Sequence, residues 1–474
     1  MKSVTSWFLW LLFLLGNVGT AQQARYQLGK QVIGFESAFQ NSMDRRDMRR
    51  AVLPNLEQAV QSFFRLSFDS AEKSIDNAWV TLVPSEHRSV AAALIPIRLT
   101  IDNHWFDSTQ NELPIELTLA YDGADIKYPL TLTVKWRDTS GRELVAQVKE
   151  ISQFPVKSSI SMMDLAEGDW SLEVSIKQGD FEWRLPAQMV SRTKDIEARY
   201  AKLKSSIDGR KSKAPDTVQR SSQLMLTLLR DLKSGRALET DIPANRILGT
   251  LEHWNETLDN KTQVLKLAAP GEYWLELDGK SRSSVVRVSV PQNIAKGGAL
   301  PVLFAFHGAG GSENMFFDAY GAGAIVGLSE KAGYLLVCPR QPLLGGVIAL
   351  EEMLDGLETL LPIDRDHVAV MGHSMGAAQT IAQVERSKPG IVRGAVILGG
   401  GRTITKPEVW RNLPVFAGAG ERDFGRRGVE LFAASCRKEG GEVREEIYDS
   451  IEHLGIVQVS LPDVFRWLEP RLKK

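Results

Sequence analysis

The stretch that decides the fold of this chain is Val368-Ala369-Val370-Met371-Gly372-His373-Ser374-Met375-Gly376-Ala377. Its first four residues are apolar and predict a buried strand, and Ala377 opens a helix-like stretch that runs to residue 388. Between strand and helix lies a G-x-S-x-G turn, whose glycines leave room for the neighbouring strand and helix. Such a turn holds the serine at its tip in a strained conformation, so the pattern predicts Ser374 as a nucleophile.

The sequence around this turn alternates strand-like and helix-like stretches. The predicted strands are residues 273–277, 285–290, 302–306, 368–371, 392–398, 415–417 and 443–448, and the predicted helices are residues 377–388, 428–438 and 462–468. Strands that alternate with helices are typical of a mostly parallel sheet with helices on both faces. We therefore predict an α/β domain over residues 263–474.

Two residues that could activate Ser374 follow it at the ends of later strands. Asp423 comes after the strand at 415–417, and His453 comes after the strand that ends near Tyr448. In folds with a strand-turn-helix elbow, the acid and the histidine follow the serine in this order. Since a serine hydroxyl needs a base to become nucleophilic, we predict His453 as general base and then general acid, and Asp423 as the carboxylate that orients it.

We interpret the other ionisable residues near these positions as structural rather than catalytic: Glu421, Asp449, His307, His367 and His373. Glu421 lies nearer to its strand than Asp423 does, and Asp449 is too close in sequence to His453 to occupy a separate loop. His373 adjoins the nucleophile but leaves the turn in another direction, so we interpret it as a packing residue.

The turn His307-Gly308-Ala309-Gly310-Gly311 directly follows the predicted strand at 302–306. Acyl transfer needs two backbone N–H donors for the oxygen that becomes negative in the transition state. We predict Met375, directly after the nucleophile, as one donor and Ala309 as the other, with Gly310 as the alternative. A phosphate-binding loop is disfavoured, because the turn matches neither G-x-x-x-x-G-K-[ST] nor G-x-G-x-x-G.

The interval between the strands at 392–398 and 415–417 is too short for a helical cap domain. The predicted site is therefore open, unless the N-terminal half of the chain covers it. An open site would admit bulky or polymeric substrates.

The N-terminal half carries two other patterns. Apolar residues recur every three or four positions over 53–79 and again over 196–254, which predicts helices. Between them, five runs alternate with period two, at 95–101, 115–121, 130–136, 170–176 and 181–185, which predicts a small antiparallel β-sandwich. The predicted order is a helical segment at 22–90, the sandwich at 91–190 and a second helical segment at 191–262.

Residues 1–21 are typical of a secretory signal peptide. Lys2 is followed by an apolar run at 7–15 and by small residues before a predicted cleavage after Ala21. The apolar run is well under the ~20 residues that span a bilayer. We expect a secreted or periplasmic protein without stable membrane insertion after cleavage.

The composition excludes some classes of protein. Lys and Arg number 57 and Asp and Glu 58, so no net field attracts nucleic acid, and no nucleic-acid partner is predicted. Cys338 and Cys436 are interpreted as small buried residues, and a disulfide bond between them is the alternative interpretation. No Cys/His spacing indicates zinc, so no metal or cofactor is expected, and His87, His104 and His253 are isolated.

Residues from about 271 to 474 resemble the α/β-hydrolase fold, and within it the secreted esterases grouped with poly(3-hydroxybutyrate) depolymerases and feruloyl esterases. The resemblance rests on residues 282–291, 301–308, 363–368 and 372–376. Similar stretches occur in prolyl-oligopeptidase-like peptidases and in relatives of dienelactone hydrolase. The sequence departs from the esterase pattern at Ala309, where many of them carry cysteine, and at Ala377, where glycine is common.

This resemblance implies a secreted serine hydrolase that cleaves carboxylic esters, short-chain or polymer-linked, through an acyl-enzyme intermediate. The expected partner is an ester or peptide substrate. A prolyl-oligopeptidase-like serine peptidase is the alternative, and a non-catalytic binding protein that retains the fold is a third possibility.

Overall fold

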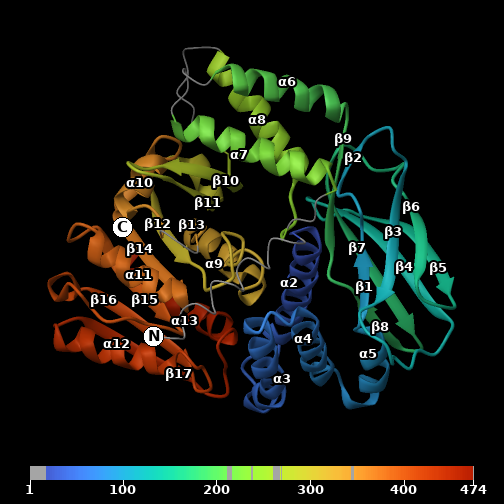
Figure 1. Ribbon diagram of the computed structural model, residues 1–474, viewed down its shortest axis with the longest axis horizontal. Coiled ribbons are helices and arrows are strands. Elements are labelled where there is room, and N and C mark those ends of the chain that lie inside the picture. The colour runs from blue at the N-terminus through green and yellow to red at the C-terminus, as the bar shows by residue number, and fades with distance from the viewer. Residues whose placement is uncertain are drawn as a thin grey trace, which may run out of the picture. The chain divides into compact units, whose positions relative to one another are not determined.

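The structure, a computed structural model, describes residues 18–210, 216–235, 239–259, 267, 269–342 and 346–472 (Figure 1). The first 17 residues of the predicted signal peptide and the predicted border at 262/263 lie outside these ranges. Among the described helices, none combines the length and the apolar character that a membrane span requires.

The chain divides into two compact units that interleave in sequence. The β unit comprises Met1–Val32, Gln61–Ile196 and Leu228–Arg246, and the α/β unit comprises Ile33–Val60, Glu197–Thr227 and Ile247–Lys474. The α/β unit thus recruits residues from both of the segments that were predicted as separate helical regions. Apolar periodicity identifies a helix but does not say which surface its apolar face will cover.

An eight-stranded sheet forms the centre of the α/β unit, in the order β10-β11-β13-β12-β14-β15-β16-β17 (Figure 1). The strands are β10 (Gly271–Asp278), β11 (Ser283–Val290), β12 (Leu300–Phe306), β13 (Leu335–Pro339), β14 (Ile363–His373), β15 (Val392–Leu398), β16 (Pro414–Gly420) and β17 (Glu442–Tyr448). The pairs β10–β11 and β11–β13 are antiparallel, and all neighbours from β13 to β17 are parallel. The predicted mostly parallel α/β sheet is confirmed.

Helices cover both faces of this sheet. They are α9 (Ala324–Ala332) and α13 (Gly455–Leu472), which pack together, and α10 (Leu350–Glu358), α11 (Met375–Arg386) and α12 (Arg426–Lys438) (Figure 1). The last helix was predicted to begin at Pro462, which is wrong. It begins at Gly455, because the Glu452 carboxylate accepts hydrogen bonds from the Leu454 and Gly455 N–H groups, both at 2.7 Å, and caps the helix there.

Five further described helices precede these elements in the sequence: α2 (Val18–Gln40), α3 (Arg46–Phe64), α6 (Ile196–Gly209), α7 (Asp216–Lys233) and α8 (Ala244–Asp259). The part of α2 from residue 33 and most of α3 belong to the α/β unit. Within that unit, α3 contacts the loop that follows β17.

The β unit contains two sheets and the helices α4 (Phe68–Leu82) and α5 (Arg88–Leu94). One sheet has the order β1-β3-β6, and the other has the order β2-β9-β7-β4-β5 with β8 paired to β7. The strands are β1 (Ile97–Thr100), β2 (Trp105–Asp107), β3 (Glu112–Leu119), β4 (Leu130–Asp138), β5 (Glu143–Ile151), β6 (Val156–Ser161), β7 (Gly168–Gln178), β8 (Phe181–Arg184) and β9 (Gln188–Thr193). All described pairs are antiparallel except β2–β9.

The five predicted alternating runs overlap β1, β3, β4, β7 and β8, and β2, β5, β6 and β9 were not predicted. Strand β9 buries polar residues, among them Gln188, Ser191 and Thr193, so its apolar alternation is hidden. Strand β5 lies at a sheet edge and exposes Val145 and Val148.

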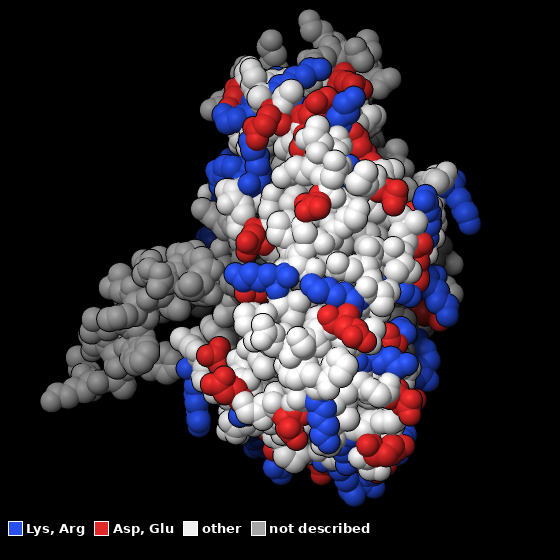
Figure 2. Space-filling view, turned by 90° about the vertical axis from the view of Figure 1, so that its right-hand side faces the viewer, with Lys and Arg blue, Asp and Glu red and all other residues white. Residues whose placement is uncertain are grey.

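Figure 2 shows one face of the molecule, the right-hand side of Figure 1, on which acidic and basic side chains are interspersed. This distribution agrees with the near-zero net charge of the chain.

Candidate active site

Ser374 stands at the tip of the turn between β14 and α11, with φ 59° and ψ −118°. Residues with a side chain rarely adopt a positive φ, so this conformation stores strain. The flanking glycines make it sterically possible. A Cβ at Gly372 would lie 2.1 Å from the Gly376 carbonyl oxygen, and a Cβ at Gly376 would lie 1.9 Å from the Phe306 carbonyl oxygen.

The structure brings Ser374, His453 and Asp423 into one hydrogen-bonded series. His453 Nε2 lies 2.9 Å from Ser374 Oγ, and His453 Nδ1 lies 2.7 Å from Asp423 Oδ1. His453 and Asp423 are only 3% and 5% exposed. Because a carboxylate can only accept, Nδ1 carries the proton and Nε2 is left to accept the proton of the serine hydroxyl.

Two backbone features fix Asp423. The Gly425 N–H donates to Asp423 Oδ1 at 2.7 Å. Gly399, which follows β15 and has φ 57°, passes so close that a Cβ there would lie 2.8 Å from Asp423 Oδ2. This role of Gly399 was not predicted from the sequence, although the run Gly399-Gly400-Gly401 at the carboxyl end of a strand indicates a close backbone approach.

The predicted oxyanion donors lie beside Ser374. Met375 is the first residue of α11, where an N–H has no acceptor within the helix. The turn with Ala309 lies against the serine, since a Cβ at Gly308 would be 3.3 Å from Ser374 Cβ. Within the described ranges, neither the Ala309 nor the Met375 N–H donates to a protein acceptor, whereas Gly310 takes part in an interaction of its own.

His307 supports this turn as the sequence analysis expected. Its Nε2 accepts the Gln341 N–H at 3.0 Å, and its Nδ1 lies 2.7 Å from the Gly308 carbonyl oxygen. Both ring nitrogens are therefore engaged in holding backbone groups, and His307 has no nitrogen available to act as a base.

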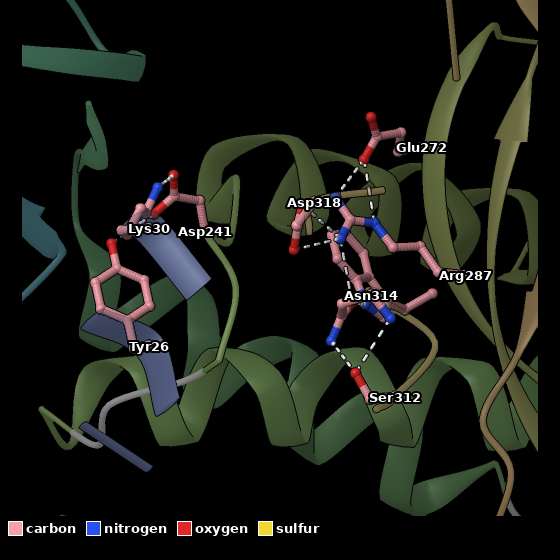
Figure 3. A network of polar contacts seen from close by, with 9 residues as sticks. Tyr26, Lys30, Asp241, Glu272, Arg287, Ser312, Asn314 and Asp318 are labelled. Carbon is pink, nitrogen blue, oxygen red and sulfur yellow. Dashed lines mark hydrogen bonds and ion pairs between the residues drawn. The ribbon is translucent and has the colours of Figure 1, made fainter. Parts of the chain in front are cut away.

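A buried arginine network, which the sequence analysis missed, holds the segment that follows the turn (Figure 3). Arg287 on β11 donates to Glu272 at 2.6 Å and to Asn314 Oδ1 at 3.2 Å. Asn314 in turn donates to Ser312 Oγ from its backbone and its side chain, both at 3.2 Å. The Arg287 guanidinium also lies 4.5 Å from the Trp274 ring centroid, a cation–π geometry.

His373 does more than pack. Its Nδ1 lies 2.7 Å from the Tyr320 hydroxyl and its Nε2 lies 2.7 Å from the His453 carbonyl oxygen. The Tyr320 hydroxyl also accepts the Gly308 N–H at 3.1 Å. Burial, together with the neighbouring His453, lowers the pKa of His373 to about 3, so the ring is neutral. The neutral ring thereby connects the Gly308 turn to the loop that carries His453.

The loop that carries His453 is held by helix α3. Arg46 Nε lies 2.5 Å from Asp449 Oδ2, and Arg50 Nε lies 3.4 Å from Ser450 Oγ. The Arg46 guanidinium lowers the pKa of Asp449. Glu421, the other acid near Asp423 that the sequence offered, accepts the Ser450 N–H at 3.0 Å. Both acids are therefore engaged in contacts that fix the loop.

Helix α2 contacts the helical turn Gly321–Gly323 and helix α13, which begins directly after the same loop. Glu36 accepts the Ala322 N–H at 2.8 Å, and Gln458 donates to the Glu36 carbonyl oxygen at 2.7 Å. Burial, and the nearby Glu452 carboxyl, raise the pKa of Glu36 well above its ordinary value. Burial likewise raises the pKa of Glu452, the residue before His453.

Phe424 is an exposed apolar residue at the site. It directly follows Asp423, and its side chain is 64% exposed. Its ring centroid lies 3.8 Å from that of His453 at an interplanar angle of 31°. A bound substrate that approaches His453 would therefore contact this aromatic ring.

The remaining expectations concern His367, metals and thiols. His367 lies within β14, where its Nδ1 is 3.0 Å from Asp364. In the described part of the chain, no group of three or more His, Cys, Asp or Glu residues could hold a metal ion. Cys338 and Cys436 are both free and buried, which confirms their interpretation as small core residues.

Comparisons with known proteins add the following. No family model matches the sequence, and no curated protein gives a significant match. An S-formylglutathione hydrolase from Agrobacterium tumefaciens matches with a TM-score of 0.35 and 14% identity, over 43% of this chain and 97% of the other. A feruloyl esterase module from Clostridium thermocellum matches with a TM-score of 0.36 and 15% identity, over 44% of this chain and 92% of the other.

The topology of the α/β unit itself confirms the expected fold class. An antiparallel β11 leads into parallel strands, the serine turn follows β14, and the acid and the histidine follow β16 and β17. This arrangement of sheet and strand-end residues is that of the α/β-hydrolase fold.

Proposed function

We propose that this α/β-hydrolase unit is a serine carboxylesterase. Ser374 Oγ attacks the ester carbonyl while His453 Nε2 takes its proton, and Asp423 stabilises the imidazolium that forms. The N–H groups of Ala309 and Met375 stabilise the oxyanion. His453 then gives the proton to the departing alcohol, and a water molecule hydrolyses the acyl-enzyme by the same steps.

The hydrogen-bonded series of Ser374, His453 and Asp423, with distances of 2.9 and 2.7 Å, is the observation that carries this proposal. The series alone would serve an esterase or a peptidase equally well. Against a prolyl-oligopeptidase-like peptidase, the β unit has sheets of three and six strands rather than a ring of four-stranded blades.

The substrates that we propose are short-chain or polymer-linked esters. Between β15 and β16 the described chain contains only one short helical turn, Pro407–Trp410, and no cap domain. An uncapped strand edge suits a substrate whose alcohol or acyl part is bulky. Export through the signal peptide at residues 1–21 would bring the enzyme to such substrates outside the cytoplasm, and Gln22 would then be the first residue of the mature protein.

Hydrolysis of p-nitrophenyl esters from acetate to laurate tests the proposal. We expect turnover that falls by at least about a thousandfold in Ser374→Ala, because removal of a triad member leaves only the oxyanion donors and binding. Ser435→Ala, an exposed serine on α12, is the matched control and should keep full activity. Full activity in Ser374→Ala would overturn the assignment, and Ser374-dependent cleavage of peptides without ester turnover would favour the peptidase.

A further inference from the structure

Tyr320 and His373 form a buried hydrogen-bonded pair that the proposed esterase steps do not use. Both side chains are 1% exposed. The Tyr320 hydroxyl lies 2.7 Å from His373 Nδ1, and the two rings meet edge to face with their centroids 5.0 Å apart. His373 directly precedes Ser374, whereas Tyr320 lies in the segment between β12 and α9. The pair therefore connects two parts of the chain that each contribute a group to the proposed site.

The contacts of this pair determine the direction of each hydrogen bond in it. His373 Nε2 lies 2.7 Å from the His453 carbonyl oxygen, which can only accept, so Nε2 carries the ring proton. Burial lowers the pKa of His373 to about 3, which keeps the ring neutral and leaves Nδ1 as an acceptor. The Tyr320 hydroxyl therefore donates to Nδ1, and its oxygen accepts the Gly308 N–H at 3.1 Å. A single arrangement of protons satisfies all three contacts.

At one end, the pair fixes the peptide unit that carries a proposed oxyanion donor. The Gly308 N–H donates to Tyr320, and the Gly308 carbonyl oxygen lies 2.7 Å from His307 Nδ1. Because this carbonyl group and the Ala309 N–H belong to one planar peptide unit, their directions are fixed together. A Cβ at Gly308 would lie 2.9 Å from the Tyr320 hydroxyl oxygen, so the two also approach closely. The direction of the Ala309 N–H therefore depends on Tyr320.

At the other end, the pair fixes the main chain of His453. The His373 Nε2–H donates to the His453 carbonyl oxygen, and the centroids of the two imidazole rings lie 4.6 Å apart. Gly399 packs against the same ring, since a Cβ there would lie 3.0 Å from His373 Nε2. The His373 ring therefore has little room to move, and it holds the backbone of His453 from the side of Ser374.

We propose that Tyr320 and His373 are positioning residues of the esterase reaction, which set the distance between the Ala309 N–H and the His453 imidazole. This inference rests on the proposed function. Both groups act on the same tetrahedral intermediate, because the N–H stabilises its oxyanion while the imidazole holds the proton. Displacement of either group raises the barrier of the chemical step and changes substrate binding in the ground state little. Neither Tyr320 nor His373 exchanges a proton with the substrate in this role.

Tyr320→Phe tests the proposal, because it removes the hydroxyl and keeps the ring, whose centroid lies 4.8 Å from that of Phe316. We expect kcat for p-nitrophenyl acetate to fall about ten- to hundredfold and KM to stay within about twofold, since a displaced donor weakens transition-state binding alone. Tyr273→Phe, which removes a buried hydroxyl bonded to the Ala269 carbonyl oxygen at 2.9 Å, is the matched control and should keep full activity. Unchanged kcat in Tyr320→Phe, or a loss confined to KM, would overturn the proposal.

A double-mutant cycle shows whether the two residues act together. His373→Leu removes both ring nitrogens, and we expect its kcat to fall by a factor similar to that of Tyr320→Phe. If the pair is one connection, kcat of the double variant Tyr320→Phe/His373→Leu should lie within about threefold of the lower single variant, because residues that share one interaction are not additive. Losses that multiply would show two independent supports and would contradict the proposed connection.

Labelling with diisopropyl fluorophosphate separates a failure of this inference from a failure of the proposed function. In that reaction Ser374 Oγ bonds to phosphorus, fluoride leaves, and His453 takes the hydroxyl proton. We expect Tyr320→Phe to be labelled about tenfold more slowly than the wild type, as followed by mass spectrometry, because the oxyanion donors also stabilise the phosphoryl oxygen. A wild-type protein that neither hydrolyses esters nor is labelled at Ser374 would overturn the esterase and this inference together. An active wild type that Tyr320→Phe matches in both assays would overturn this inference alone.

Discussion

The two sides of the proposed active site are built in different ways. On the nucleophile side, Ser374 is positioned by residues within a few positions of it, since Gly372 and Gly376 allow β14 and α11 to meet at a strained turn. On the histidine side, the loop of His453 is held by Arg46 and Arg50, which are some four hundred positions away in sequence. The nucleophile side is thus a local structure, and the histidine side depends on long-range packing.

This difference predicts that substitutions on the two sides will fail in different ways. On the nucleophile side a substitution meets backbone atoms that cannot move without shifting a strand. On the histidine side several independent contacts share the task, so the loss of one should be tolerated. The following substitutions test this contrast.

Gly376→Ala should have the largest effect. The new Cβ would lie 1.9 Å from the Phe306 carbonyl oxygen and 2.7 Å from that of His307, both backbone atoms. Either β12 or α11 must shift, and overpacking of this kind costs about 1–3 kcal/mol or more. We expect esterase activity to fall at least about a hundredfold, as displaced catalytic groups lose their geometry, and the unfolding temperature to fall.

The control is Gly327→Ala in α9, where a Cβ would meet no atom within 4 Å. Alanine in an exposed helix position should raise stability slightly, by up to about 1 kcal/mol. Wild-type activity in Gly376→Ala would contradict the explanation that the glycines are needed for the turn at residues 372–376.

The same contrast explains what the sequence could predict. The elbow, the order of Ser374, Asp423 and His453 and the turn at Ala309 are each encoded in short stretches with a defined strand context, and the structure brings these residues together. The supports of the His453 loop left no comparable signal. Helical periodicity in residues 33–60 predicts an apolar face, but not that this face belongs to the α/β unit.

Buried polar residues account for other features that were not predicted from the sequence. Arg287 and Glu36 are buried, and single residues of this kind look in the sequence like ordinary surface charges. Strand β9 was missed for the same reason, because its buried Ser191 and Thr193 break the apolar alternation. Burial of a polar group depends on partners that are distant in sequence, and apolar patterns do not report them.

Glu36→Gln should have an intermediate and pH-dependent effect. The pKa of Glu36 is raised by burial from an ordinary value of 4.5, so the folded protein holds a proton that the unfolded chain releases. The stability that this group contributes is complete below about pH 4.5 and is lost as the pH rises through the raised pKa. Glutamine resembles the protonated form and keeps an acceptor for the Ala322 N–H.

The variant should therefore match the wild type near pH 4 and unfold about 2–4 °C higher at pH 8, as measured by thermal unfolding across this range. Glu408→Gln, an exposed residue in the turn before β16, should change the unfolding temperature little at any pH. If Glu36→Gln were less stable than the wild type at pH 8, Glu36 would be ionised in the folded protein and the argument from burial would fail.

Arg46→Gln should have the smallest effect. It tests whether several contacts together hold the His453 loop, so that the loss of one is tolerated. It removes the pair with Asp449, but the Arg46 side chain is 61% exposed, and exposed ion pairs are weakened by solvent and salt and contribute little to stability. Ser450 and Glu421 would still hold the loop through the contact at 3.0 Å. We expect kcat/KM for p-nitrophenyl acetate to fall by about twofold, a small part of the loss expected for Gly376→Ala.

Salt gives this prediction a second readout. Because exposed pairs are screened, the difference between Arg46→Gln and the wild type should disappear at about 1 M salt, where the Debye length is about 3 Å. Arg365→Gln, which removes exposed pairs with Asp355 and Glu358, should leave kcat/KM unchanged at every salt concentration. A loss above tenfold in Arg46→Gln that persisted in high salt would mean that the histidine side is as intolerant as the elbow, and the contrast between the two sides would be lost.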